Sequence, residues 1–395
     1  IQSVKINKDS LKLISNKWVD GFIGDTTIIF KTESQPSHFI LDKNFETTDF
    51  NFYNHFSKAQ GIFKQIKPTK LKLVPVDINN NKENHIYLTP LLAWNKYDKL
   101  MPGLAFYNKG IKTKKTEWLL SPLFSFESKA INGIGEIIHY HNFNSFINRI
   151  EYGYKFKSFS SKFESTGSYD RWIRQEIFTE LRIRESKMRY TPAQKIILKA
   201  ININDHIISG NSISPPQTIG QKSYYGQIIY YLKNKQLLKP KNLEFKYTYG
   251  FSKLISSLEL TTESKINYNQ NLDALEIRVF AGYNFHTTGD TYNLFNRGQD
   301  GFYDYLFDRT YLGRNINFPS PIAQQSSNSH GAFKINTSLG SSASWLISTN
   351  ISLKVPKVPI NLFSDFGVYP NIIYDVNNQQ STEEVKFLYN TGISF

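Results

Sequence analysis

The sequence predicts an all-β chain: a transmembrane antiparallel β-barrel of about 14 to 16 strands, preceded by a small β-sandwich segment. Three observations predict this fold class. Of the 395 residues, 15% are aromatic, with 30 Phe and 24 Tyr, and such residues favour strands. Segments of about 10 residues alternate apolar and polar positions, as membrane-crossing strands do. Mean hydropathy is −0.41, and no apolar run reaches the roughly 18 residues that a spanning helix needs.

The first part of the chain, residues 1–45, has the pattern of a small β-sandwich segment. Short strand-like runs at 4–6, 11–18, 26–30 and 38–41 are separated by turn residues. Residues 46–69 lose this regularity, and we interpret them as a linker.

Residues 70–395 are predicted to form the barrel, because long segments there alternate with period two. The expected strands are 70–77, 85–94, 101–109, 116–127, 131–143, 147–160, 170–186, 189–204, 222–233, 242–251, 254–266, 272–286, 328–339, 344–354, 360–369 and 384–395. Aromatic residues near segment ends resemble the interfacial girdles of such barrels: Trp94, Trp118, Tyr140, Tyr154 and Trp345.

The last predicted strand shows the alternation best. Val385, Phe387, Tyr389, Thr391, Ile393 and Phe395 fall on one face. Tyr389, Ile393 and the final Phe395 form the expected C-terminal barrel signal. A barrel closes by pairing its last strand with its first, which leaves no exposed edge.

The segment 171–185 is apolar on one face and charged on the other. In a soluble sandwich the charged face meets water, whereas in a membrane barrel it lines the lumen and the apolar face meets lipid. The predicted lumen-lining residues are Arg149, Glu151, Lys155, Arg174, Glu176, Glu180, Arg182, Arg184, Glu276 and Arg278. Two interpretations stay open: a pore that selects solutes by charge, or a packed lumen whose charges pair with one another.

Residues 287–327 do not alternate cleanly. Either a strand is hidden within them or the stretch folds into the lumen, and Asp308, Arg309 and Arg314 are the candidate residues of an inward loop. Twelve predicted strands precede this stretch, so an even count places it on the periplasmic side, which is unusual for long loops of such barrels.

No complete active site is evident, so we do not expect this chain to be an enzyme. Cysteine is absent, which excludes thiol nucleophiles and cysteine metal sites. No glycine-rich phosphate loop, nucleophile elbow or metalloprotease helix is found. His139 and His141 lie two apart in an expected strand without a third ligand nearby, so neither a metal nor a cofactor is predicted. The net charge of +14 comes from scattered residues, and nucleic acid is not an expected partner.

Three sequence stretches resemble the C-terminal part of bacterial gluzincin aminopeptidase-like membrane proteins. Residues 17–24 (KWVDGFIG) with 39–42 (FILD) are similar to the closing β-sandwich of the peptidase. Residues 94–107 (WNKYDKLMPGLAFY) are similar to the first hairpin of the family's barrel. Residues 305–314 (YLFDRTYLGR) with 331–334 (GAFK) are the third stretch. The resemblance implies a peptidase region before Ile1, but the family's zinc motif is absent from this sequence.

The leading hypothesis is therefore a membrane anchor in the outer membrane of a Gram-negative bacterium. This metallopeptidase-associated barrel would contact outer-membrane lipid and serve as a subunit of a larger envelope protein complex. Two alternatives remain: a porin-like channel for small solutes, and a soluble all-β binding protein.

Overall fold

The computed structural model describes most of the chain, and every statement below concerns the described residues only. These are residues 1–7, 10–20, 26–29, 31–43, 46, 55–61, 64, 69–73, 84–110, 114–162, 169–184, 192–209, 217–234, 236, 238–252, 255–269, 273–286, 293–296, 304–309, 329–334, 337, 339–375 and 380–394. They fold as strands and connections without a helix, and so offer no helical segment long and apolar enough to cross a membrane. The all-β prediction is confirmed.

The N-terminal part forms a four-stranded sheet in the order β2-β1-β3-β4. Its strands are β1 (Gln2–Asn7), β2 (Ser10–Asn16), β3 (His38–Ile40) and β4 (Phe56–Lys58). Val4, Ile40 and Phe56 form its buried cluster. Two details differ from expectation, since residues 26–29 form no strand and β4 comes from the segment interpreted as linker. An isolated three-residue strand has too few residues to show a period of two.

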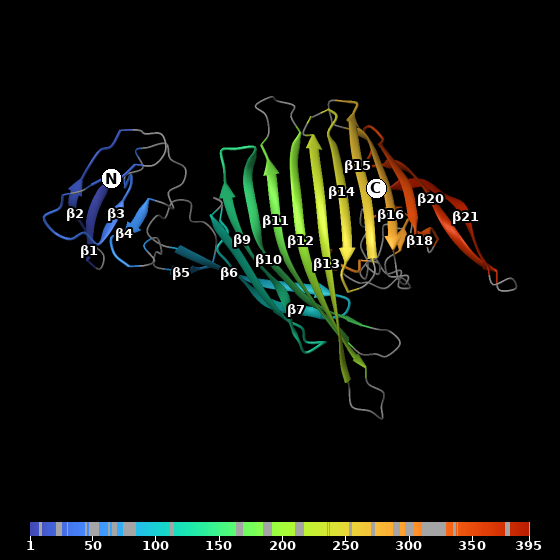
Figure 1. Cartoon of the computed structure of the whole chain (residues 1–395), viewed down its shortest axis with the longest axis horizontal. Coiled ribbons are helices and arrows are strands. Elements are labelled where there is room, and N and C mark those ends of the chain that lie inside the picture. The colour runs from blue at the N-terminus through green and yellow to red at the C-terminus, as the bar shows by residue number, and fades with distance from the viewer. Residues whose placement is uncertain are drawn as a thin grey trace. The chain divides into compact units, whose positions relative to one another are not determined.

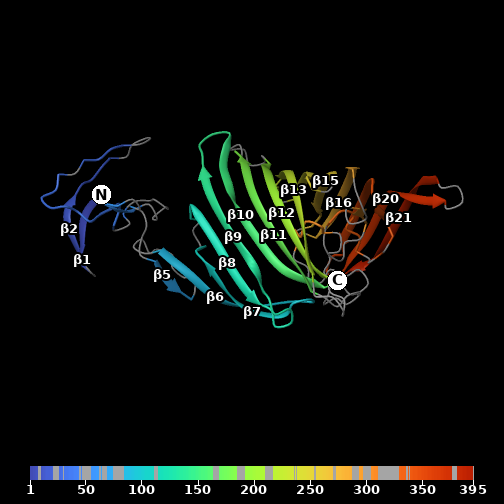
Figure 2. The same cartoon turned by 60° about the horizontal axis from the view of Figure 1, so that its bottom comes forward.

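The larger part is a fifteen-stranded sheet in the order β21-β20-β19-β16-β15-β14-β13-β12-β11-β10-β9-β8-β7-β6-β5. Its strands are β5 (Thr69–Lys72), β6 (Asn84–Asn95), β7 (Lys99–Tyr107), β8 (Thr116–Phe124), β9 (Ile131–Asn142), β10 (Ile147–Lys162), β11 (Tyr169–Ile183), β12 (Ala193–Ser209), β13 (Gln217–Asn234), β14 (Lys241–Gly250), β15 (Ile255–Asn267), β16 (Ala274–His286), β19 (Trp345–Lys354), β20 (Asn361–Asp375) and β21 (Gln380–Ser394). From β9 onward all neighbours are antiparallel. Figure 1 and Figure 2 show β9 to β16 side by side in sequence order.

The first strand of this sheet differs from the others, because β5 pairs with β6 in parallel. A parallel strand is not part of the up-and-down meander, and the remaining strands, β6 to β21, number fourteen. Counting residues 70–77 as a meander strand was therefore wrong. Eleven meander strands, β6 to β16, precede the connection from β16 to β19, and three, β19 to β21, follow it. Because an odd number of strands follows, this connection falls at the opposite end of the sheet from the C-terminal end of β21. The predicted periplasmic placement of residues 287–327 rested on that count and does not follow from it.

The connection between β16 and β19 contributes no strand to the large sheet in its described residues. Leu294–Phe295 (β17) pair with Ser341–Ser342 (β18) in a separate two-stranded sheet. The strand expected at 328–339 is absent from the described residues 329–334, 337 and 339. Two of these residues instead bond within the connection itself: Gly331 donates to the Phe295 carbonyl and Phe333 to the Asn296 carbonyl.

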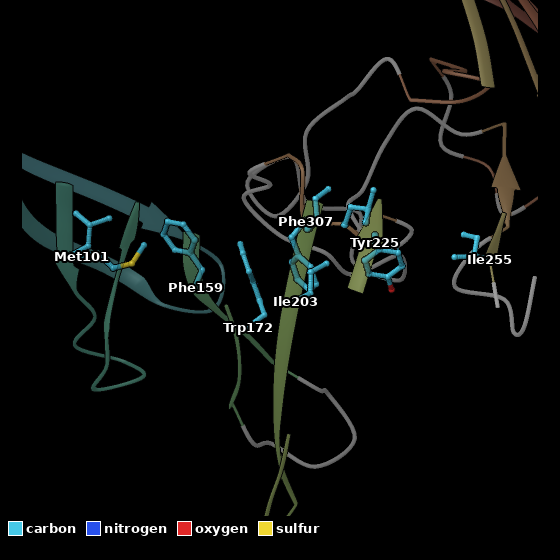
Figure 3. Close-up of a cluster of buried hydrophobic side chains, with 10 residues drawn as sticks. Met101, Phe159, Trp172, Ile203, Tyr225, Ile255 and Phe307 are labelled. Atoms are coloured by element: carbon cyan, nitrogen blue, oxygen red, sulfur yellow. The ribbon is translucent and has the colours of Figure 1, made fainter. Parts of the chain in front are cut away.

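One face of the large sheet carries a buried apolar cluster at the end where β10 finishes and β11 begins. It includes Phe159, Trp172, Ile203 and Tyr225 from neighbouring strands, with Leu306 and Phe307 from the connection between β16 and β19. The rings of Trp172 and Phe307 lie 4.2 Å apart between centroids. Figure 3 shows Phe307 reaching into this row of strand side chains. Within 287–327 the described residues thus contain one short strand, β17, outside the large sheet, and a turn at 304–309 that packs on the face of the sheet.

Candidate functional site

The two faces of the large sheet are inverted relative to a soluble sheet. On β11 the charged side chains of Arg174 and Glu176 are each 3% exposed, whereas Ile177 on the other face is 64% exposed. Strand β21 is similar, because Phe387, Tyr389 and Ile393 are between 59% and 66% exposed. We call the charged, covered face the inner face and the apolar, exposed face the outer face.

The outer face is apolar along an unbroken row of cross-strand partners. From β10 to β21 the partners are Ile150, Leu181, Ile196, Tyr230, Phe245, Leu260, Ala281, Ile347, Val368 and Phe387. None of them is buried. The row therefore crosses every strand of the large sheet from β10 to β21 and is not confined to one hairpin.

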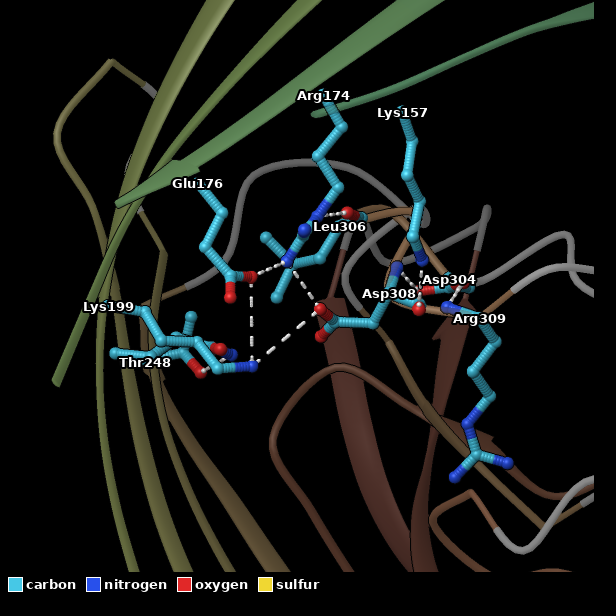
Figure 4. A network of polar contacts seen from close by, with 10 residues as sticks. Lys157, Arg174, Glu176, Lys199, Thr248, Asp304, Leu306, Asp308 and Arg309 are labelled. Carbon is cyan, nitrogen blue, oxygen red and sulfur yellow. Dashed lines mark hydrogen bonds and ion pairs between the residues drawn. The ribbon is translucent and has the colours of Figure 1, made fainter. Parts of the chain in front are cut away.

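The inner face holds the connection between β16 and β19 at a first point, around Arg174. Its guanidinium donates to the Leu306 carbonyl at 2.8 Å, to Asp308 at 2.6 Å and to the neighbouring Glu176. The Lys157 ammonium donates to the Asp308 carbonyl at 2.8 Å. Figure 4 shows these groups converging from the strands onto the turn. We call this set of contacts the first clamp.

The turn that enters the first clamp is itself ordered by Asp304. Its carboxylate accepts hydrogen bonds from the backbone of Asp308 at 3.2 Å and of Arg309 at 3.0 Å. Because these bonds fix the turn, the Asp308 carboxylate points at Arg174 and lies 3.9 Å from the Lys199 ammonium. Arg309 is exposed, and Arg314 lies outside the described residues.

A second clamp holds residues 329–334 on strands β16, β19 and β20. Arg278 donates to the His330 carbonyl at 2.7 Å and to Asn350 at 3.1 Å. Asn350 in turn donates to the Gly331 carbonyl and to Asp365, both at 2.9 Å. The other oxygen of the fully buried Asp365 accepts from the Lys334 backbone at 2.9 Å. The connection is thus tied to the inner face at two separate places.

Between the clamps, Lys246 and Glu259 form an ion pair of 2.9 Å. His330 lies 3.8 Å from the same carboxylate and packs between Phe280 and Phe295, with centroid distances of 5.5 and 4.4 Å. Burial lowers the pKa of His330 to about 4, against the opposing effect of Glu259. The imidazole is therefore neutral near pH 7 and sits against the carboxylate without carrying a charge.

The remaining predicted lumen-lining residues divide into two groups. Arg149 and Arg182 share Glu151, at 3.0 and 2.6 Å, and Arg182 also pairs with Glu180 at 2.8 Å. Lys155 lies over the ring of Phe178. Arg184 and Glu276 are more exposed than expected: Arg184 follows the end of β11 and bonds Asn144, and Glu276 pairs with Lys265. The alternation of a strand predicts on which face a side chain lies but not how deeply it is buried. Arg184 and Glu276 lie near the end of the inner face.

Two pockets adjoin on the inner face at the end where β11 and β13 finish. One has a volume of about 590 Å³ and lies over β11 to β15. The other, about 610 Å³, lies over β14 to β19 beside residues 332–334. Asn242 and Glu263 line both pockets. The clamped connection therefore leaves polar space at this end of the face.

One structurally important residue was not predicted from the sequence. Asp98, fully buried in the turn between β6 and β7, accepts four hydrogen bonds. They come from the side chains of Asn95, Ser128 and Asn132 and from the backbone of Ser160, at 2.7 to 3.0 Å. The bonds join this turn to β9, β10 and the turn before β9. The sequence shows only an acidic residue between two expected strands, and the four donors come from three separate segments.

The structure brings together no metal site among the described residues. His139 and His141 pack instead against Tyr152 and Phe143, with centroid distances of 5.2 and 4.3 Å. Phe395 lies outside the described residues.

Comparison with protein-family models and with curated proteins finds no match for this chain. The functional argument therefore depends on the inverted faces of the sheet and on the clamped connection.

Proposed function

We propose that the chain is an outer-membrane β-barrel whose outer face contacts lipid and whose inner face encloses the clamped connection. The observation that carries the proposal is the apolar row from Ile150 to Phe387, none of whose members is buried, opposite a face of buried charges. Monomeric soluble proteins rarely expose contiguous apolar patches above a few hundred Å². A soluble all-β binding protein would leave the whole row in water.

The height of the apolar surface fits a bilayer. On β16 the outer positions are apolar from Leu275 to Phe285. At about 3.3 Å per residue these ten steps cover roughly 33 Å, and a tilt of about 45° reduces this to roughly 23 Å of vertical height. Outer-membrane barrels have an apolar band of about 25 Å.

Aromatic pairs border this surface at one end. Tyr249 packs against Phe251 beyond β14, and Tyr283 against Phe285 at the end of β16, with centroid distances of 5.0 and 4.9 Å. Both pairs lie at the same end, because β14 and β16 run in the same direction. Aromatic girdles at the membrane interface have this arrangement. Tyr154, expected near a strand end, lies in the middle of β10.

We further propose that the sheet closes by pairing β21 with the part of β6 that follows Tyr87. β5 and β21 stand at the two ends of the sheet order, and β5 pairs only with residues 84–87 of β6. Closure would satisfy the backbone groups of both strands, which hydrocarbon cannot do.

Anchoring is the role that the inner face supports best. Its charges pair with one another and with a connection tied down at two clamps, as in a packed lumen. The attached peptidase-like region and a larger envelope complex rest on the sequence resemblance alone. The two pockets favour a second candidate, a channel for small solutes, and conductance in planar bilayers separates the two candidates.

Refolding of the urea-unfolded chain into lipid vesicles tests the proposal. We expect the chain to resist extraction by alkaline carbonate and to protect its strands from added protease. Recovery of a folded, monodisperse chain from detergent-free buffer would refute the membrane proposal.

A further inference from the structure

The smaller pocket, about 590 Å³ in volume, separates opposite charges onto two walls. Its basic wall is made by Arg182, Lys195 and Lys233 on β11, β12 and β13. Its acidic wall is made by Glu244 and Glu263 on β14 and β15. Glu180 also lines the pocket on the basic side, where it is shared by Arg182 and Lys195 at 2.8 and 3.1 Å. Arg182 also pairs with Glu151, but Glu151 is shared with Arg149 and Lys233 has no ion pair in the described residues, so the basic wall remains positive.

The separation of charges follows from the strand register. Two neighbouring rows of cross-strand partners have the same order of charged and neutral residues. In the first row Lys195 is opposite Tyr231, and Tyr231 is opposite Glu244. In the second row Lys233 is opposite Asn242, and Asn242 is opposite Glu263. Each row therefore runs from a cation through a neutral polar residue to a carboxylate.

The neutral residues keep the walls apart. Tyr231 lies opposite Glu244 in the strand register, and Asn242 donates to Glu263 at 3.3 Å. The ammonium of Lys195 lies over the Tyr231 ring at 4.8 Å. Residues two strands apart have backbones about 10 Å apart, so cation and acid in one row do not meet directly.

The acids of this pocket also differ from other carboxylates on the inner face. Glu151, Glu176 and Glu259 each have a cationic partner. In the described part of the chain, neither Glu244 nor Glu263 is in an ion pair, although Arg278 lies opposite Glu263 in the strand register. Neither Arg278 nor Lys246 is among the described residues that line this pocket, so the acidic wall presents the two carboxylates to the cavity, opposite the basic wall.

We propose that this pocket binds a short peptide through its charged termini. The carboxylate of the peptide faces the basic wall and its ammonium faces the acidic wall. Three residues of extended chain span about 10 Å, which matches the separation of the walls, and the volume is within the range of small-ligand sites, about 300 to 1,000 Å³. The proposal depends only on the inner face of the large sheet. Peptide binding is a function beyond membrane anchoring.

Calorimetric titration of the detergent-solubilised full chain with trialanine tests the site. We expect saturable binding that weakens about tenfold when the tripeptide is N-acetylated, and about tenfold when it is C-amidated, since each change removes one charge contact. These comparisons use the unaltered protein, so they do not depend on any variant folding. Absence of saturable binding, or equal affinity for all three peptides, would overturn the proposal.

Paired substitutions assign each terminus to its wall. Glu263→Gln should remove the effect of N-acetylation and leave that of C-amidation, whereas Lys233→Gln should do the reverse. Glu276→Gln, which lies outside this pocket, is the matched control and should change neither effect. If acetylation weakens binding to Glu263→Gln as much as to the unaltered chain, the proposed orientation is wrong. Because peptide binding is measured in detergent, an absence of binding can be distinguished from a failure of the chain to insert into vesicles.

Discussion

The guanidinium of Arg174 on β11 donates to the carboxylate of Asp308 at 2.6 Å, across 134 positions of sequence. Arg174 is 3% exposed and also bonds Glu176. This buried arginine joins two carboxylates and so fixes residues 304–309 on β11, together with the Lys157 bond and the packing of Phe307 against Trp172. The ion pair thus ties a connection between strands to the face of the sheet.

Replacing Arg174 with Met should destabilise the protein by about 3 kcal/mol, because Glu176 and Asp308 lose their closest cation. Lys199, 3.9 Å from both carboxylates, keeps the effect at the low end of the range for broken buried pairs. Urea unfolding in vesicles measures the stability, and protease cleavage within residues 287–344 measures release of the connection. Arg184→Met, directly after the end of the same strand and exposed, is the control and should change neither measurement. Equal effects of the two variants would contradict the clamp.

Neighbouring residues on opposite faces of β15 should respond differently to a charge. Leu260→Arg places a guanidinium on the outer face near mid-strand, where lipid contact makes it cost about 2 to 4 kcal/mol. Thr261→Arg places the same group in the smaller pocket, and we expect less than about 1 kcal/mol. Reversible unfolding in vesicles gives both values. A larger cost for Thr261→Arg would reverse the assignment of the faces.

Acid should loosen the second clamp. The pKa of His330 is lowered from 6.5 to about 4 by burial, so the unfolded chain takes up the proton first as the pH falls. The stabilisation is complete above about pH 6.5 and is lost between there and about pH 4, a change of about 3 kcal/mol.

Protonation of Asp308, like that of His330, lowers the stability of the protein as the pH falls. Burial by itself raises the pKa of Asp308, but Lys199 and Arg174 outweigh it and the net pKa is lowered. Its contribution is therefore present above the ordinary pKa of an aspartate and is lost as the pH falls through the lowered value. His330→Phe, which keeps a ring between its two aromatic neighbours, should flatten stability against pH from 6.5 to 4. An unchanged slope in that variant would show that the imidazole is not responsible.

Closure of the sheet can be tested by cross-linking, because the chain has no cysteine. Cys at Leu92, on the outer face of β6, should form a disulfide with Cys at one of Val385, Phe387 or Tyr389, since paired strands bring Cα atoms within about 4.4 to 6.8 Å. Leu260→Cys, in the middle of the sheet, is the control and should link to none of them. Mass analysis must find the link within one chain; links between chains alone would indicate an open edge.

The alternation of side chains allowed the all-β fold and the two faces to be predicted. On β11 the contrast between Glu176 and Ile177 is visible in the sequence itself, since β-structure repeats every two residues. The parallel pairing of β5 was not predictable, because a four-residue run looks the same in either orientation. The expected side of the connection between β16 and β19 changed because neither β5 nor the described residues of 328–339 supply a meander strand.

The clamps were only partly predictable. Asp308 was selected because its segment breaks the alternation, but nothing local indicates that its partner is Arg174. Such pairings depend on how strands distant in sequence align, and a single sequence does not record this. Lys157, Lys199 and Asp365 were missed for the same reason: each is one polar residue among many on an alternating strand.

Oxygen accessibility of spin labels in vesicles tests the central claim most directly. Single cysteines can be labelled at Ile228, Phe245 and Ile347 on the outer face and at Glu244 and Thr261 on the inner face. We predict that the outer labels collide mainly with oxygen dissolved in lipid and the inner labels with a water-soluble nickel chelate. Outer labels that are quenched by the chelate and shielded from oxygen would contradict the assignment of this face to the membrane.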